Sequence, residues 1–350
     1  MGISVATSSD GNTVAISASG RREVTPGFNR IYRWDGLDWT KQGLDLVGGS
    51  MVLSSDGSTV AIKANGAVYI FRWIGSTWEQ LGAGFDDDAP FDNLISVDLP
   101  SDGSVVAYAH GANPGQVRIF QWNGLSWEQR GSSIDGGAGD HLGFSIGLSN
   151  DGGTVAVGSF SADTNGSDSG LVRVFQWTGS VWEQQGSNII GEAAGYRSGS
   201  PVALSSDGAT LAIGAKNQVR VYTSDGGPRP NPDDRCRGNG SAGALDAPID
   251  CWVQLGQDID GEAAGDDAGT AVAVSQDGNT VAIGEPGYDG SRRDHGRVRV
   301  FRWDNPAWTQ LGEGIDGDFD LTKAGLSVAL SSDGNTVAIS GNNAARVFNW

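Results

Sequence analysis

The chain has 350 residues, 55 of them glycine, and a formal net charge of −19. A negative field of this size repels nucleic acid and anionic membrane surfaces, so we expect no nucleic-acid partner. No apolar stretch approaches the roughly 18 residues of a membrane helix, so we expect no membrane insertion. The start, MGISVATSSDG, lacks the basic and apolar regions of a signal peptide. If the protein is exported, we expect its targeting segment to be missing from this chain.

One ten-residue element recurs along the whole chain. SSDGNTVAIS at residues 8–17 returns unchanged at 331–340, and five looser copies lie between them. The copies contain seven Asp-Gly pairs, whose aspartates are Asp10, Asp56, Asp102, Asp151, Asp207, Asp277 and Asp333. Their mean spacing of about 54 residues is that of a four-stranded propeller blade with long loops. The sequence therefore predicts one all-β domain over residues 1–350, a seven-bladed β-propeller with blades at approximately 3–46, 47–92, 93–138, 139–194, 195–263, 264–320 and 321–350.

Each repeat contains four short strand signals, which we name A to D in chain order. In the sixth repeat they are TAVAVS (270–275), TVAIG (280–284), VRVFRW (298–303) and WTQLGEGI (308–315). They are rich in Val, Ile and aromatic residues and are bounded by turn-forming residues. No segment has a sustained 3.6-residue apolar period, so almost no helix is expected.

The Asp-Gly pair lies between strands A and B. Asp-Gly between two apolar strands is a strong signal for a tight hairpin, because glycine adopts positive φ without steric cost. A calcium loop is the functional alternative, but it needs several oxygen ligands, as in D-x-D-x-D-G. Each copy here offers one aspartate with serine before it, which favours the turn.

Ten of the twelve tryptophans form pairs separated by four residues. The pairs are predicted to flank the C–D hairpins, where aromatic residues on facing strands stabilise the pairing; they are Trp34/Trp39, Trp73/Trp78, Trp122/Trp127, Trp177/Trp182 and Trp303/Trp308. Trp252 and Trp350 occupy the same motif positions singly. We therefore assign the tryptophans to architecture rather than to a ligand-stacking surface.

These repeats resemble a known family. GTAVAVSQDGNTVAIG…GRVRVFRW and AGLSVALSSDGNTVAISG…ARVFNW are similar to FG-GAP-type repeats of integrin-like propellers, in the variant found in large extracellular proteins of marine bacteria and algae. The run DIDGEAAGD at 258–266 is also typical of that variant. The resemblance implies a seven-bladed propeller in an extracellular or cell-surface setting, commonly for adhesion or recognition. The family often binds calcium in the A–B hairpin, but these turns lack the extra carboxylates.

The fifth repeat carries an insertion at residues 224–251, where other blades have a four-residue C–D loop. Cys236 and Cys251 lie within it. They are either free thiols or a disulfide, and we favour the disulfide, which suits an oxidising compartment. Closing a loop of this size contributes roughly 3 kcal/mol in the chain-entropy model.

The last repeat lacks a D-strand signal. The motif W-x-Q-x-G or a close variant occurs six times, whereas A, B and C signals occur seven times. Blade 7 is therefore predicted to lack its outermost strand and to leave strand C with an unpaired edge. We expect a neighbouring domain or partner strand to complete it.

The candidate ligand-binding face is formed by the B–C and D–A loops, which vary most between repeats. Its tentative ligand-binding residues are Asp140, His141, Asp163, Asp168, Asp289, Asp294 and His295. Four nearby carboxylates form the tentative calcium site, since calcium takes six to eight oxygen ligands; they are Asp260, Glu262, Asp266 and Asp267. The alternative is that these carboxylates only keep the protein soluble.

Function is predicted less sharply than fold. The favoured interpretation is an extracellular recognition or adhesion module that binds a glycan or a protein, with calcium as its candidate cofactor and no other cofactor. One alternative is a carbohydrate-active enzyme, a polysaccharide hydrolase or lyase, although no catalytic signature such as G-x-S-x-G or H-E-x-x-H is present. The other is a structural subunit of a surface assembly. A deep pocket with convergent carboxylates would favour the enzyme hypothesis. A broad, shallow face would favour the binding-module hypothesis.

Overall fold

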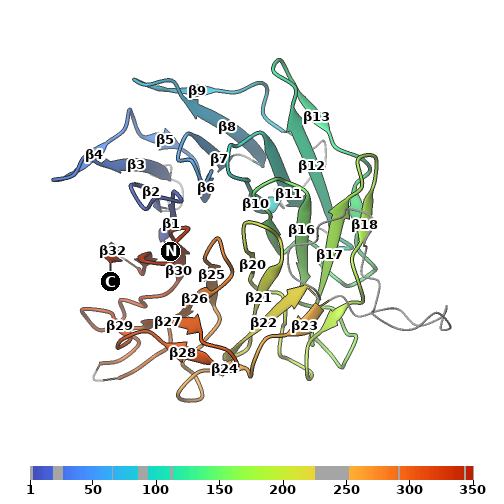
Figure 1. Cartoon of the computed structure of the whole chain (residues 1–350), viewed down its shortest axis with the longest axis vertical. Helices are drawn as coiled ribbons and strands as arrows, with labels where there is room; N and C mark the ends of the chain where they lie inside the picture. The colour runs from blue at the N-terminus through green and yellow to red at the C-terminus, as the bar shows by residue number, and fades with distance from the viewer. Residues whose placement is uncertain are drawn as a thin grey trace.

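The computed structural model describes residues 3–18, 27–64, 66–85, 94–110, 113–224, 252–290, 292–342 and 344–349. Seven antiparallel β-sheets are arranged like blades around a central axis, in chain order, so that the first and last sheets are neighbours (Figure 1). This confirms the predicted seven-bladed propeller. Within these residues, no helix is long and apolar enough to cross a membrane.

The first four blades contain nineteen of the strands. Blade 1 has β1 (Ile3–Thr7), β2 (Thr13–Ala18), β3 (Phe28–Trp34), β4 (Trp39–Lys41) and β5 (Leu46–Val47), and blade 2 has β6 (Met51–Leu53), β7 (Thr59–Ala64), β8 (Ala67–Trp73) and β9 (Trp78–Gln80). Blade 3 has β10 (Leu94–Asp98), β11 (Val105–His110), β12 (Gln116–Trp122), β13 (Trp127–Gln129) and β14 (Ile134–Asp135), and blade 4 has β15 (Ser145–Leu148), β16 (Thr154–Ser159), β17 (Leu171–Trp177), β18 (Trp182–Gln184) and β19 (Ile189–Ile190).

The remaining strands belong to the last three blades. Blade 5 has β20 (Val202–Leu204), β21 (Thr210–Ala215), β22 (Gln218–Ser224), β23 (Trp252–Gln254) and β24 (Ile259–Asp260), and blade 6 has β25 (Ala271–Val274), β26 (Thr280–Glu285), β27 (Arg297–Trp303), β28 (Trp308–Gln310) and β29 (Ile315–Asp316). Blade 7 has β30 (Ser327–Leu330), β31 (Thr336–Ser340) and β32 (Ala345–Asn349).

The Asp-Gly element is a turn, as predicted. In blade 7 the Gly334 N–H donates to the carbonyl oxygen of Ser331, and Gly334 has a φ of 69°. The aspartate folds the turn, because Asp333 accepts the Ser331 hydroxyl at 2.6 Å and the Asn335 N–H at 3.0 Å. These bonds hold the pKa of Asp333 below its usual value. The carboxylate is therefore engaged within its own hairpin.

A closed belt of backbone hydrogen bonds joins the seven A–B turns around the axis. In each turn, a backbone N–H donates to a carbonyl of the next blade at 2.6 to 3.4 Å; the accepting residues are Ser55, Ser101, Asn150, Ser206, Gln276, Ser332 and Ser9. The last bond, from Ser332 to Ser9, joins blade 7 to blade 1. The Val5 N–H also donates to the Ser327 hydroxyl across the same junction at 3.3 Å. Ring closure therefore rests on direct contact between the first and last blades.

Strand D is broken, whereas the sequence predicted one continuous strand. In blade 6, β28 pairs with one end of β27 and β29 pairs with the other end. Gly312 lies between them with a φ of 63°. The Gln310 side chain donates to the Gly312 carbonyl at 3.2 Å and closes this kink, which explains the spacing of glutamine and glycine in W-x-Q-x-G.

The tryptophan pairs lie opposite each other across the C–D hairpins, as predicted, with their ring planes tilted by 50° to 58°. Their ring centroids are 5.3 to 5.5 Å apart in all five pairs. In four blades the strand-D tryptophan has a second role, because its indole N–H donates to a carbonyl of the preceding blade. The buried indole nitrogen of Trp252 in blade 5 has no hydrogen-bond partner among the described residues. Trp182 donates to Arg130 at 2.7 Å and Trp308 donates to Leu255 at 2.7 Å. Each such tryptophan therefore joins two blades.

Replacing Trp182 by phenylalanine is expected to lower the free energy of unfolding by about 1 kcal/mol, because the Arg130 carbonyl loses its donor. Thermal unfolding followed by circular dichroism checks this. Trp177→Phe is the matched control, since this partner ring donates no hydrogen bond to another blade within the described chain. Equal melting temperatures for the two variants would contradict the inter-blade role.

Blade 7 has three strands in the described residues, in the order β30-β31-β32. The missing strand D agrees with the prediction. The blade-5 insertion beyond Ser224, with Cys236 and Cys251, lies outside the described residues, so the disulfide stays a prediction.

Candidate functional site

The D–A loops of four consecutive blades share one unusual backbone position. It is occupied by non-glycine residues with φ between 48° and 57°, and each is followed two residues later by glycine; they are His141, Arg197, Asp267 and Lys323. Left-handed conformations are costly for such residues and are found at functional sites when the surrounding structure enforces them. One fixed backbone position thus presents four different ionisable side chains on the same face.

The B–C loops of blades 4 and 6 hold two of these residues, Arg197 and Lys323, in place. The Arg197 N–H donates to the Asp168 carbonyl at 2.9 Å, and the Lys323 N–H donates to the Asp294 carbonyl at 3.0 Å. Asp168 and Asp294 are left-handed too, with φ of 53° and 46°. The predicted B–C and D–A face is therefore a set of loops joined by backbone pairing.

Three of the predicted ligand-binding carboxylates fold these loops. Asp163 accepts the Asp168 N–H at 2.9 Å, and Asp289 accepts the Asp294 N–H at 2.8 Å. Asp140 accepts the Gly137 N–H at 2.8 Å within its own D–A loop. Each uses an oxygen to satisfy a backbone donor, which explains why the loops contain aspartate at these positions.

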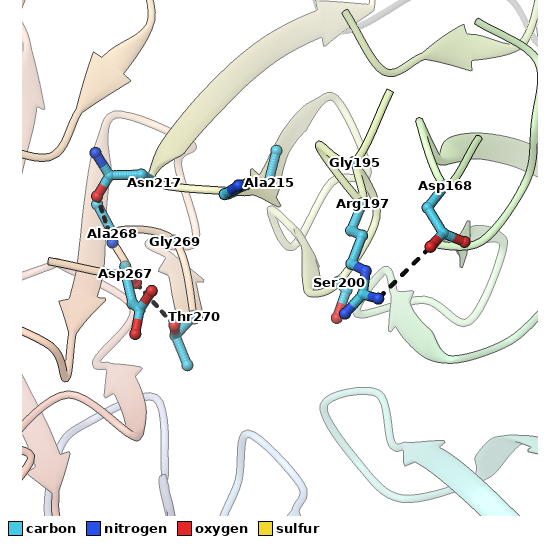
Figure 2. Close-up of a pocket in the computed structure, with 11 residues that line it drawn as sticks. Asp168, Gly195, Arg197, Ser200, Ala215, Asn217, Asp267, Ala268, Gly269 and Thr270 are labelled. Carbon is cyan, nitrogen blue, oxygen red and sulfur yellow. Dashed lines mark hydrogen bonds and ion pairs between the residues drawn. The ribbon is translucent and has the colours of Figure 1, made fainter. Parts of the chain in front are cut away.

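A cavity of about 480 Å³ opens where the loops of blades 4, 5 and 6 meet. Arg197 and Asp168 lie on one side and Asp267 and Thr270 on the other, with Asn217 above Asp267 in the view (Figure 2). The volume falls within the range of about 300–1,000 Å³ of small-ligand sites. Seven of the eleven residues that line it have polar side chains, so the cavity suits a polar ligand.

Some of the charged side chains around this cavity form an ion pair, and others have no partner among the described residues. Arg197 pairs with Asp168 at 3.5 Å, but 61% of its side chain stays exposed. Lys216 is exposed and lines the cavity, and within the described chain its ammonium group has no partner. The Asp267 carboxylate on the opposite wall also has no partner there. Two cationic groups in an otherwise strongly acidic protein therefore face the cavity.

An aromatic cluster adjoins the cavity beside Arg197. The Phe144 and Phe160 rings are 4.3 Å apart, and His141 is 6.1 Å from Phe160. The Arg197 guanidinium lies 5.8 Å from the Phe160 ring, so it connects the cluster to the cavity. Phe144 is 37% exposed, which leaves part of this cluster accessible.

The four tentative calcium ligands point to different partners. Glu262 pairs with Arg297 at 3.0 Å, and the buried Asp266 accepts the Ala263 N–H at 2.7 Å. Asp260 lies in β24, and Asp267 faces the cavity. Among the described residues, no group of three His, Cys, Asp or Glu side chains is placed to hold a metal ion. Calcium binding stays a prediction.

His295 is buried rather than presented on the face. Its side chain is 1% exposed, and Nδ1 lies 2.7 Å from the Arg292 carbonyl. Nε2 lies 3.6 Å from Asp316, which also accepts from Arg297 at 2.7 Å. The neighbouring Asp294 carboxylate lies 3.8 Å from Arg293. His295 therefore belongs to the interior of blade 6.

Sequence reasoning missed Arg197, Lys216, Asn217 and Thr270 as lining residues. Aligning the D–A loops on their glycine, as HLG, RSG, DAG and KAG, would have revealed the position shared by His141, Arg197, Asp267 and Lys323. The contribution of Lys216 has no such signal, because it follows a B strand in an unremarkable short turn.

A second, smaller cavity of about 180 Å³ lies on the axis at the A–B end. Its single ionisable lining residue is Asp98, where the other blades have Ala, Val or Gly. Asp98 accepts the Leu148 N–H at 2.7 Å and the Leu99 N–H at 2.9 Å. Burial raises the pKa of Asp98 to about 7 despite these two bonds.

Comparison with solved structures supports the propeller architecture. The chain is similar to hydrazine synthase of Kuenenia stuttgartiensis, with a TM-score of 0.63 and 14% identity over 99% of this chain and 94% of that one. It is also similar to a functionally unknown protein from Desulfotomaculum acetoxidans, with a TM-score of 0.60 and 14% identity over 100% and 92% of the two chains. At this identity the likeness shows the fold alone. No protein-family model and no curated protein sequence matches the chain, so membership of the FG-GAP-type family stays a prediction.

Proposed function

We propose that this protein is a recognition module that binds an acidic glycan on its B–C and D–A loop face, in an extracellular setting. The observation that carries the proposal is the polar cavity between blades 4, 5 and 6, with Arg197 and Lys216 on its walls. Both cations lie on loops that differ between repeats, whereas the scaffold beneath them is nearly constant. Variable loops on a rigid scaffold are a common location for binding.

The chemistry of the cavity supports a carboxylated, hydroxyl-rich ligand. Arg197 and Lys216 offer donors to a carboxylate, and charge-assisted hydrogen bonds of this kind are strong. Asp267, Asn217 and Thr270 offer acceptors and donors to hydroxyl groups. The adjoining rings of Phe144 and Phe160 offer an apolar surface to the face of a sugar ring.

The enzyme alternative has no comparable support. Of the two carboxylates that line the cavity, Asp168 is paired with Arg197, and Asp267 lies across the cavity from that pair. No observation favours polysaccharide cleavage or a purely structural role over binding.

A glycan array that includes uronate-containing and neutral oligosaccharides tests the proposal. We expect binding to the uronate-containing members, with affinity reduced at least about tenfold by Arg197→Ala combined with Lys216→Ala, since each lost charged hydrogen bond costs about 1.5–3 kcal/mol. Arg302→Ala removes an exposed arginine of β27 elsewhere and is the matched control. Running the array with calcium and with chelator tests the calcium prediction separately. Equal binding of neutral and acidic glycans, or an unaffected double variant, would contradict the proposal.

A further inference from the structure

The outer edge of blade 7 lacks the strand D that the other six blades have, among the described residues. In the other six blades, the middle of strand C accepts a backbone hydrogen bond from the residue after the first part of strand D; in blade 6 the Leu311 N–H donates to the Val300 carbonyl at 2.8 Å. The alignment of β32 with β27 places Val347 at the position of Val300. Within the described chain, no strand pairs with this side of β32.

The preceding blade has a glycine that lacks, among the described residues, a contact that its equivalents make with both tryptophans of the next blade; the strand-C tryptophan of blade 7, Trp350, lies outside the described residues. In four blades, the glycine of W-x-Q-x-G packs against the tryptophan pair of the next blade; the glycines are Gly43, Gly82, Gly131 and Gly256. A Cβ added to them would lie 2.6 to 3.1 Å from the nearest atom of those indole rings. The equivalent glycine facing blade 7 is Gly312, and there no described atom lies within 4 Å.

The matching acceptor is free as well. The residue before each of those glycines accepts the indole N–H of the next strand-D tryptophan, at 2.7 to 3.2 Å. Leu311 precedes Gly312, and its carbonyl accepts no hydrogen bond within the described chain. The side chains of β32 are also more exposed than their blade-6 counterparts, since Arg346 is 27% exposed and Arg299 is 7% exposed.

We propose that the edge formed by β32, Leu311 and Gly312 binds an extended segment of the type W-x-Q-x-G-x-x-I-D that is not one of the six already present in this chain. Such a segment would pair antiparallel with β32, donate its indole N–H to Leu311 and place its tryptophan against Gly312. A second copy of this chain has no spare segment of this type, because its own six D segments occupy their blades. The occupant is therefore a segment from outside these 350 residues.

A synthetic peptide with the sequence of residues 307–317, AWTQLGEGIDG, tests this inference with the full 350-residue protein. We expect it to bind one protein molecule in calorimetry and to slow hydrogen exchange of the Val347 and Asn349 amides in β32. Replacing the peptide tryptophan by alanine, or methylating the backbone nitrogen of its leucine, is expected to weaken binding at least about tenfold, since each removes a hydrogen bond.

A matched control distinguishes strand pairing from nonspecific binding of the peptide. Methylation of the backbone nitrogen of the peptide glutamine should leave affinity nearly unchanged, because that N–H points away from β32 in the register of blade 6. Equal affinity of all four peptides, or unchanged exchange in β32 at the highest soluble peptide concentration, overturns the inference. A dimer in which the β32 amides are protected without peptide also overturns it, since a second copy would then cover the edge.

Discussion

Replacing Arg299 by leucine is expected to lower the free energy of unfolding by about 3–5 kcal/mol near pH 8, because it leaves the Glu285 carboxylate buried without its cation. Glu285 is fully buried in β26, and Arg299 in β27 donates to it through Nε at 2.8 Å and also through Nη2. Its second carboxylate oxygen, Oε2, has no partner within the described chain. Breaking such a pair is far more costly than replacing both partners.

The cost should depend on pH in a defined direction. Burial raises the pKa of Glu285, and the hydrogen bond and charge of Arg299 oppose that rise. Without Arg299 the pKa rises further, so Glu285 takes up a proton as the pH falls and the penalty shrinks. Urea denaturation near pH 8 and near pH 5 measures this difference.

A double variant, Glu285→Ala with Arg299→Leu, is the control. Ala215 occupies the position of Glu285 in blade 5, so the scaffold accepts a small side chain there. We expect this variant to regain most of the lost stability near pH 8. A single variant that loses equal stability at both pH values would show that packing, rather than the unpaired charge, is responsible.

Replacing Asp98 by asparagine is expected to raise the stability of the protein relative to the wild type as pH increases from about 4 to 7. The folded-state pKa of about 7 lies above the ordinary value, so the stabilisation from Asp98 is full below about pH 4 and is lost as pH rises through 7. The full shift corresponds to about 4 kcal/mol. Asp98 is only half-buried and faces the axial cavity, where water reduces the effect, so we expect about 2 kcal/mol.

Melting temperature measured across this pH range checks the prediction. The difference between Asp98→Asn and wild type should grow with pH and become constant above about pH 8, whatever its value at low pH. Asp333→Asn is a suitable comparison, because the pKa of Asp333 is lowered and its contribution to stability is lost at acidic pH instead. A difference that does not vary with pH would show that Asp98 titrates normally.

The propeller, its seven blades and the missing outer strand of blade 7 could all be predicted from the amino-acid sequence. These features depend on short-range interactions. The Ser331, Asp333 and Gly334 turn closes within a few residues, and the Trp303 and Trp308 rings meet across a four-residue hairpin. Such signals come from residues that are close together in the sequence, and they recur in nearly every repeat.

Which charged side chains lie close together could not be predicted from the sequence, because it depends on contacts between separate repeats. Arg197 and Asp267 are 70 residues apart in sequence and line one cavity, whereas Asp266, directly beside Asp267, folds its own loop. The closed belt of A–B turns likewise depends on hydrogen bonds between neighbouring blades. The loop sequences indicated that carboxylates gather on this face. The ring arrangement of the blades decides which side chains meet, because it brings loops from separate repeats together.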